Sequence, residues 1–334
     1  VIKEPTDADY DKDEFEKILE AKGSNDYSKL INMLDAFNDG DCDVEDFVEK
    51  YFDEDSIYTW MAFNILVDNK DADTGNFYLY SPTGSDKFYV IPWDYDGAFR
   101  YDYEKLRDED YSPGWKKGVY IYNDSKLFSR MVRDEKCTNK LSERIAALHE
   151  GVLSGDNIHK KALELSRSVK SKLYSLPDMT YARVTEANYD MLIELLKNQA
   201  DENYYAYYDS LETPAPFHIH EPGNKDGHVV ISWDASDLLG GPVTYSLELS
   251  DSWDFTSKIK DETGIKETQM DVGELSEGQY FVRVKADTDK GLSQEAYEYY
   301  NTEQKTRVHG VMCFYVKADG STVQSVYGTE GDKE

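Results

Sequence analysis

The chain is poor in cysteine and contains no long apolar run. Its three cysteines, Cys42, Cys137 and Cys313, are odd in number and far apart, and no C-x-x-C motif occurs. Neither a disulfide framework nor a zinc site is therefore predicted. No segment approaches the roughly 18 apolar residues that a membrane-spanning helix needs. The chain opens on Val1 without an initiator methionine or a signal sequence, and we expect it to be a piece of a longer protein.

Basic residues are also scarce. The chain has 37 lysines and arginines against 67 acids, which gives a formal net charge of -30. This charge repels nucleic acids and anionic membranes, and it favours cations or basic polypeptides as partners. The 334 residues, 40% of them hydrophobic, are enough to build two packed domains.

The first two thirds of the chain have a helical pattern. Apolar residues recur at three- and four-residue steps over 15–62, and again over 141–148, 158–173 and 191–208. Asp55 is the expected N-cap of the helix that precedes residue 69. These segments predict a mostly helical domain over residues 1–212.

The pattern changes near residue 213, where three prolines and two glycines interrupt the helices in "LETPAPFHIHEPGNKDG". Short alternating runs follow, which predict an antiparallel sandwich over 213–320 and an acidic, flexible tail over 321–334. Trp233 and Tyr280 resemble the core tryptophan and the corner tyrosine of fibronectin type III domains. The predicted fold class is thus α+β multidomain, with helices first and an all-β sandwich second.

The most informative stretch is "NKDADTGNFYLYSPTGSDKFYVIPWDYDGAF", residues 69–99. It predicts two strands, 77–80 and 88–91, joined by a turn that contains proline and glycine. In such a hairpin the residue before the first strand and those after the second lie at one end, so Asn76 and Asp94 become neighbours. Asp71 precedes Asn76 by five positions, on the loop that leads into the hairpin.

This order of helix, D-x-x-x-x-N loop, hairpin and Asp is typical of phosphoryl transfer. That reaction needs hard oxygen ligands for Mg²⁺ and a carboxylate aimed at the incoming hydroxyl. A calcium-binding loop is the alternative, but Thr74 stands where glycine is required and Tyr80 where the closing Glu belongs.

The other acids and aromatic residues of the stretch have plainer interpretations. Acids are so common in this chain that Asp68, Asp73, Asp86 and Asp96 are expected to be solvated loop charges. The three aromatic residues Trp93, Tyr78 and Phe88 are expected in the core.

With "YTWMAFNILVDNKDADTGNFYLY" followed by "KFYVIPWDYDGAF", the chain resembles the CotH family of spore-coat and secreted bacterial proteins, which are atypical protein kinases. The resemblance covers roughly residues 1–210 and implies a kinase C-lobe. It makes Asp71 the catalytic Asp, and Asn76 and Asp94 the residues that bind the metal and the nucleotide. Asp96 is either a further metal ligand or a cap of the following turn. The implied cofactors are ATP with Mg²⁺ or Mn²⁺.

One departure from the family matters. The resemblance places the phosphate-covering loop, the nucleotide-anchoring lysine and its Glu partner upstream of the helices present here. Lys3 is isolated, and no G-x-G-x-x-G motif occurs in the chain. We therefore expect this fragment by itself to be inactive.

The implied setting is extracellular, on a bacterial cell or spore surface, with a basic, Ser-containing protein as the substrate. Two rivals remain. One is a non-catalytic binding or scaffold protein with a structural metal site. The other, which is disfavoured, is a calcium-dependent carbohydrate-binding protein, because no aromatic platform beside an acidic cluster can be assigned.

Overall fold

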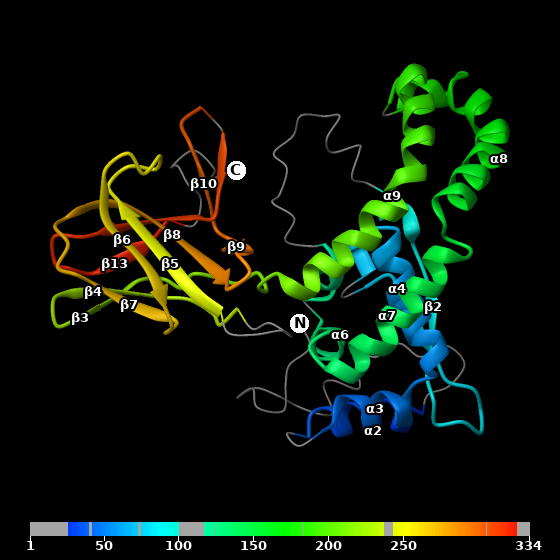
Figure 1. The fold of residues 1–334 in the computed structure, drawn as a ribbon, viewed down its shortest axis with the longest axis horizontal. Coiled ribbons are helices and arrows are strands. Elements are labelled where there is room, and N and C mark those ends of the chain that lie inside the picture. Colours follow the sequence, from blue (N-terminus) through cyan, green and yellow to red (C-terminus); the bar gives the residue numbers. More distant parts are fainter. Residues whose placement is uncertain are drawn as a thin grey trace. The chain divides into compact units, whose positions relative to one another are not determined.

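The computed structural model describes residues 26–39, 42–72, 75–99, 117–123, 125–182, 184–236, 243–304 and 306–325 (Figure 1). Helices and antiparallel sheets are both present, so the fold class is mixed α+β as predicted. The helical pattern predicted at residues 15–25, Lys3 and the last nine residues of the predicted tail, 326–334, lie outside the described residues. Within the described ranges, no helix is long and apolar enough to cross a membrane.

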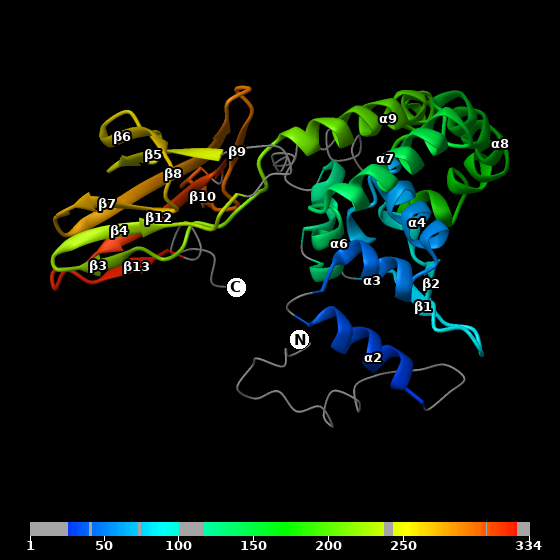
Figure 2. The same ribbon diagram turned by 60° about the horizontal axis from the view of Figure 1, so that its bottom comes forward.

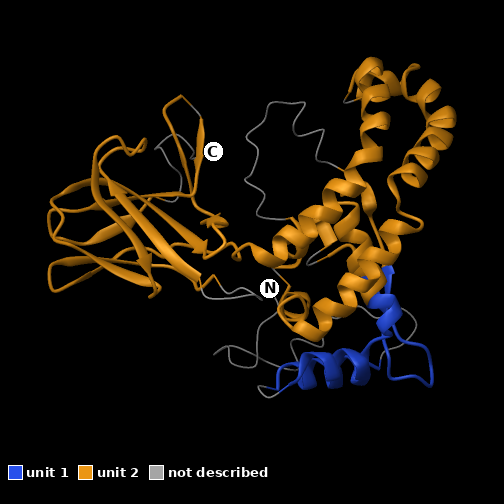
Figure 3. Cartoon of the chain, in the orientation of Figure 1, with its two compact units in different colours: residues 1–57, 78–91 blue, residues 58–77, 92–334 orange. Residues whose placement is uncertain are grey.

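The chain divides into two compact units (Figure 3). The first unit comprises Val1–Ile57 with Tyr78–Ile91, and the second comprises Tyr58–Phe77 with Pro92–Glu334. The domain boundary near residue 213 stays a prediction. The last described helix ends at Glu212, and the strands that follow begin at Gly223.

The first unit is held together by aromatic contacts and by one lysine. It contains helices α2 (Ser28–Phe37) and α3 (Val44–Tyr51), whose Phe37 and Phe47 rings lie 5.2 Å apart. From α2, the Lys29 ammonium donates to the carbonyl oxygens of Pro82 and Ser85 in the hairpin turn. A helix thereby fixes the turn of the hairpin.

The hairpin strands are β1 (Phe77–Tyr80) and β2 (Tyr89–Pro92), which form a two-stranded sheet. The first strand matches the prediction and the second begins and ends one residue later. Helix α4 (Glu54–Leu66) begins one residue before the predicted cap. Asp53, not Asp55, is its cap, because the Asp53 carboxylate accepts from the Ser56 amide at 2.9 Å.

An aromatic cluster forms the centre of the helical part of the second unit. The Trp60 ring on α4 lies 5.0 Å from Phe77, 5.8 Å from Tyr122 and 5.1 Å from Phe128. These residues come from β1, η3 (Gly118–Tyr122) and α6 (Lys126–Met131). Tilted and edge-on ring contacts of this kind add to the stabilisation that burial of the rings provides.

Three longer helices complete this part. They are α7 (Glu135–Glu150), α8 (Gly155–Leu173) and α9 (Glu186–Glu212), with the short turn η4 (Asp178–Tyr181) between the last two. Side chains of Asp134 and Thr185 cap α7 and α9. Figures 1 and 2 show α8 running beside α9, which the contacts between the two helices confirm.

The strands after α9 form two main layers. The strand order is β13-β12-β8-β5-β6 in the larger sheet, to which β9 is added beside β8, and β3-β4-β7 in the smaller sheet. The bounds are β3 (Gly223–Lys225), β4 (His228–Ser232), β5 (Val243–Ser250), β6 (Lys258–Ile265), β7 (Gln269–Gly273), β8 (Gly278–Thr288), β9 (Ser293–Glu295), β10 (Tyr299–Asn301), β11 (Arg307–His309), β12 (Val311–Val316) and β13 (Thr322–Gln324). Strands β10 and β11 pair separately.

Side chains from both sheets share one core. Ile231 of β4, Leu247 of β5 and Phe314 of β12 are fully buried in the same cluster. Trp233 is only 2% exposed there, as predicted. The Tyr280 hydroxyl donates to the Ser276 carbonyl oxygen at 2.9 Å, which is the corner contact that the sequence predicts. Assignment to the fibronectin type III family stays a prediction.

A histidine-carboxylate pair on the smaller sheet predicts that the stability of the sandwich depends on pH. His228 Nδ1 lies 2.9 Å from an Asp271 oxygen, and this hydrogen bond raises the pKa of His228 above 6.5 and lowers that of Asp271 below 3.8. The His228 contribution to stability is complete below the pKa of the unfolded state and is lost as pH rises through the folded pKa. The Asp271 contribution is lost as pH falls through its own lowered pKa.

We therefore expect His228→Gln to lower the urea midpoint at pH 5.5 and to leave it nearly unchanged at pH 8.5. The comparison is between wild type and variant at each pH, because other histidines also titrate. Asp271→Asn removes the charge of the other partner and should lower the urea midpoint at pH 5.5 by the same amount. A His228→Gln effect of equal size at both pH values would show that protonation of His228 does not strengthen the pair.

Candidate functional site

The site is built on the C-terminal end of α4. The last carbonyl groups of a helix have no intrahelical donor and must find one elsewhere. The Asn203 side chain of α9 donates to the Leu66 carbonyl at 2.9 Å, and the Phe99 amide donates to the Val67 carbonyl at 2.8 Å. These bonds fix α9 and the segment after the hairpin to the same helix end.

Two asparagines continue this network. Asn64 donates from its side chain to the Trp60 carbonyl at 2.9 Å, which leaves its Oδ1 to accept from Asn69 Nδ2 at 3.1 Å. The orientation of both amides follows from this chain of bonds. Asn69 Oδ1 then points the other way and is buried without a hydrogen-bond partner. An unpaired buried acceptor costs about 1–3 kcal/mol.

Asp71 and Asn69 both face Gly97. Asp71 lies on the turn η1 (Lys70–Ala72), and Gly97 ends the turn η2 (Tyr95–Gly97) that follows the hairpin. A Cβ atom at Gly97 would lie 2.6 Å from Asp71 Oδ2 and 3.0 Å from Asn69 Oδ1. The Asp71 carboxylate thus packs against the backbone of η2, and only glycine leaves room for it.

Asn76 reaches the same segment from the other side. Its carbonyl oxygen accepts from the Trp93 amide at 3.1 Å, directly before Asp94. Asp71 and Asn76 therefore both adjoin the short segment 93–97, which carries Asp94 and Asp96. Asn76 is half-buried, whereas Asp71, Asp94 and Asp96 are exposed.

The structure does not gather the predicted acids into one tight cluster. The three carboxylates of Asp71, Asp94 and Asp96 do not all lie within 4.8 Å of one another. A hard cation at Asn76 and Asp94 would take its remaining ligands from phosphate groups and water, which is how Mg²⁺ is commonly bound. The amide and carboxylate oxygens present are of the type that Mg²⁺ and Mn²⁺ prefer.

Backbone conformation marks this region as unusual. Asp68, Asn76, Asp94 and Phe99 have φ of 49°, 60°, 55° and 58°, in the left-handed region that non-glycine residues seldom adopt. Asn and Asp tolerate this conformation better than most residues, but for Phe99 it is costly. Such conformations persist where the surrounding contacts over-determine them, and they concentrate at functional sites.

Several predictions for single residues need correction. Trp93 and Tyr78 are 56% and 52% exposed, so they are not core residues, whereas Phe88 is buried as predicted. Asp68 is not a solvated charge: it is 5% exposed and lies 3.6 Å from the Lys70 ammonium. Asp86 and Asp96 are exposed as predicted. Asp73 and Thr74 lie outside the described residues.

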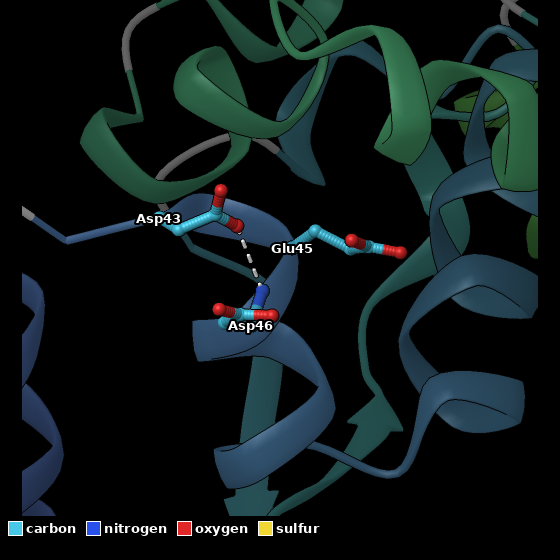
Figure 4. Close-up of side chains that lie close together, drawn as sticks. All are labelled: Asp43, Glu45 and Asp46. Carbon is cyan, nitrogen blue, oxygen red and sulfur yellow. Dashed lines mark hydrogen bonds between the residues drawn. The ribbon is translucent and has the colours of Figure 1, made fainter.

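A compact acidic group does occur elsewhere in the part of the chain that the structure describes. Figure 4 shows Asp43, Glu45 and Asp46, whose carboxylate oxygens lie within 4.8 Å of one another. Asp43 accepts from the Asp46 amide at 3.0 Å and caps α3. All three lie at the N-terminal end of that helix, where negative charge is favourable, so capping explains the group.

Three residues of the site were not predicted: Asn64, Asn69 and Gly97. Asn69 stands two positions before Asp71 and forms the N-x-D ending of the preceding helix, which is the one signal in the sequence. Nothing in the sequence indicates that Gly97 touches Asp71.

Comparisons with known proteins identify the family of the chain. The family model described as CotH kinase protein matches residues 1–207. Among solved structures, the twitchin kinase region from C. elegans is similar at 20% identity and a TM-score of 0.21. That similarity covers 29% of this chain and 20% of the twitchin chain, so this chain spans about one fifth of that protein's length. No curated protein matches.

The contact between Gly97 and Asp71 can be tested by a double-mutant cycle. We expect Gly97→Ala to lower the free energy of unfolding by about 1–3 kcal/mol, because the new methyl group overlaps the Asp71 carboxylate. In the Asp71→Ala background the same change should cost at least about 1 kcal/mol less, since the overlapping atoms are gone. Urea denaturation measures all four proteins.

Gly223→Ala serves as the control, because a Cβ atom there meets nothing within 4 Å. Equal costs of Gly97→Ala in both backgrounds would mean that Asp71 does not occupy this position in solution.

Proposed function

The chain belongs to the CotH kinase protein family, and on this basis we propose that it is the C-lobe of an atypical protein kinase. The protein of which it is part would transfer phosphate from ATP to a Ser or Thr hydroxyl. The observation that carries the proposal is the family match over residues 1–207, which contain Asp71, Asn76 and Asp94. The contact of Asp71 with Gly97 supports it by placing the carboxylate beside the segment that carries Asp94.

Asp71 would be the catalytic Asp. Its exposed carboxylate can accept the proton of an acceptor hydroxyl as the hydroxyl oxygen forms a bond to the γ-phosphorus of ATP. The bond from that phosphorus to the bridging oxygen breaks, and ADP leaves. Packing against Gly97 restricts the carboxylate to a narrow range of orientations, which general-base catalysis requires.

Asn76 and Asp94 would hold Mg²⁺ or Mn²⁺, with Asp96 as a further ligand. The alternative that Asp96 caps the following turn is wrong, because Asp96 lies inside η2 and Asp94 occupies the N-cap position. The bound ion would neutralise phosphate charge during transfer. The left-handed backbone at Asn76 and Asp94 turns the chain sharply just before the first strand and just after the second. The hydrogen bond from the Trp93 amide to the Asn76 carbonyl holds these two chain segments together at the open end of the hairpin.

Further parts of the proposal concern setting and substrate. We propose an extracellular location on a bacterial cell or spore surface, with the fibronectin-like sandwich acting as a spacer or tether. A basic, Ser-containing acceptor is favoured because a net charge of -30 attracts cationic polypeptides.

The assay that tests phosphotransfer uses the product of the full gene, including any residues that precede Val1. With labelled ATP and Mn²⁺, we expect Asp71→Asn and Asp94→Asn each to lower the rate by at least about 100-fold, because each removes a charge that acts in the reaction. Asp86→Asn, the same change on the exposed hairpin turn, should leave the rate unchanged.

Residues 1–334 alone lack a G-x-G-x-x-G loop and should bind metal weakly and transfer little phosphate. Robust transfer by the full protein that survives both site changes would refute the assigned roles. Absence of transfer by the full protein to any acceptor would instead favour the alternative, a binding or scaffold module.

Acceptor preference gives a second test. Matched Ser peptides, one rich in Lys and Arg and one rich in Asp and Glu, are offered to the full protein at low and high salt. We expect faster phosphorylation of the basic peptide and a loss of that advantage as salt screens the attraction. A preference for the acidic peptide, or equal rates at low salt, would contradict the proposal.

A further inference from the structure

Exposed apolar side chains are concentrated where α8 turns back toward α9. Leu165 and Val169 of α8 are 52% and 47% exposed, and Leu176, Met179 and Tyr181 of the following turn are 72%, 48% and 81% exposed. Single exposed apolar residues are ordinary, but a contiguous group of them is typical of an interaction surface.

A shallow cavity is lined by residues of both α8 and the turn that follows it. It has a volume of about 390 Å³ and is lined by Ser168, Val169, Lys172 and Leu173 of α8 and by Asp178 and Tyr181 of η4. The lining therefore combines apolar side chains with one ammonium group, that of Lys172, and one carboxylate, that of Asp178.

This surface is not needed to hold α8 in place. The half-buried row of α8, Ile158, Ala162, Ser166, Lys170 and Leu173, marks the side of the helix that faces α9. Lys170 on that row pairs with Asp190 of α9 at 2.7 Å. Leu165 and Val169 lie beside this row and add little to the packing between the two helices.

The charges along the exposed row are basic. Lys161, Leu165, Val169 and Lys172 follow one another at four- and three-residue steps, so they form one stripe with a lysine at each end. Lys172 has no ion-pair partner among the residues that the structure describes. Lys161 pairs with Glu164 at 3.0 Å, with both side chains more than 60% exposed, and such a pair contributes little to stability.

We propose that this stripe and its cavity dock an amphipathic helix of another protein, with leucine-like side chains on one face and acidic residues at both ends of that face. The apolar residues would cover Leu165 and Val169, one of them entering the cavity. The acidic residues would meet Lys161 and Lys172. This proposal does not depend on phosphotransfer.

Charge also argues against two other occupants of this surface, a second copy of the chain and an anionic membrane. If α8 packed against α8 of a second copy, either direction of pairing would bring lysines of the two stripes near each other. An anionic membrane would be repelled by the net charge of -30 carried by the whole chain. A membrane is wide enough to meet acids well beyond the stripe, whereas a narrow acidic helix meets mainly the groups within about one Debye length, roughly 8 Å at physiological salt.

The test uses two labelled synthetic helical peptides with leucines at four-residue spacing, one with Glu and one with Lys at the flanking positions. Fluorescence anisotropy with the whole chain should show at least tenfold tighter binding of the Glu peptide. The double change Leu165→Ser with Val169→Ser should weaken it at least tenfold. Lys161→Glu with Lys172→Glu should reverse the preference toward the Lys peptide.

Ile259→Ser, a change of an exposed apolar residue on β6, is the control and should leave binding unchanged. Circular dichroism melting establishes that each variant folds, and the charge reversal tests the proposal even if the serine variant does not fold. No binding of the Glu peptide, or unchanged preference after charge reversal, would overturn the proposal. So would binding to phosphatidylserine vesicles without peptide binding, or dimerisation in sedimentation that the serine changes abolish.

Discussion

The C-terminal end of α4 is the constraint on which the candidate site depends. Its last carbonyl groups lie inside the protein, where they cannot form hydrogen bonds with water. Each must therefore accept a hydrogen bond from the surrounding chain. The donors come from α9, from the segment after the hairpin and from Asn69 itself. Meeting this requirement brings residues far apart in the sequence to one place, and Asp71 follows two residues later. The position of the carboxylate is thus a by-product of satisfying a helix end.

Features with strong local signals were predicted well. Strand β1 matches the predicted limits because alternating residues and a turn define it. Trp233 lies in the sandwich core because a large apolar ring can be accommodated there. The cap of α4 was misjudged, since Asp53 and Asp55 are equally good caps by type. A tertiary contact decides between them, because the Asp53 amide also donates to the Phe88 carbonyl in the hairpin.

The remaining errors have similar causes. Trp93 and Tyr78 were expected in the core because they are large aromatic residues. Tyr78 lies on the exposed face of strand β1, and Trp93 directly follows strand β2. Gly97 and Asn69 lie too far apart in the sequence for any pattern to connect them. Their contact depends on the path of the backbone between residues 76 and 97, which includes the left-handed turns at Asn76 and Asp94. The roles of Asp71 and Asp94 stay predictions that rest on residue type and order, whereas the packing of Asp71 against Gly97 could not be predicted at all.

The left-handed backbone at Asp94 separates the requirements of the fold from those of the chemistry. The bend at that position would be met as well by asparagine, and better by glycine, neither of which carries charge. Relatives of this chain could therefore exchange the acid for one of these residues and keep the hairpin, the turn and the core intact. If Asp94 holds the metal as proposed, such an exchange would abolish phosphotransfer and leave little trace in stability, so catalytic and non-catalytic descendants would share one architecture and differ at a single side chain.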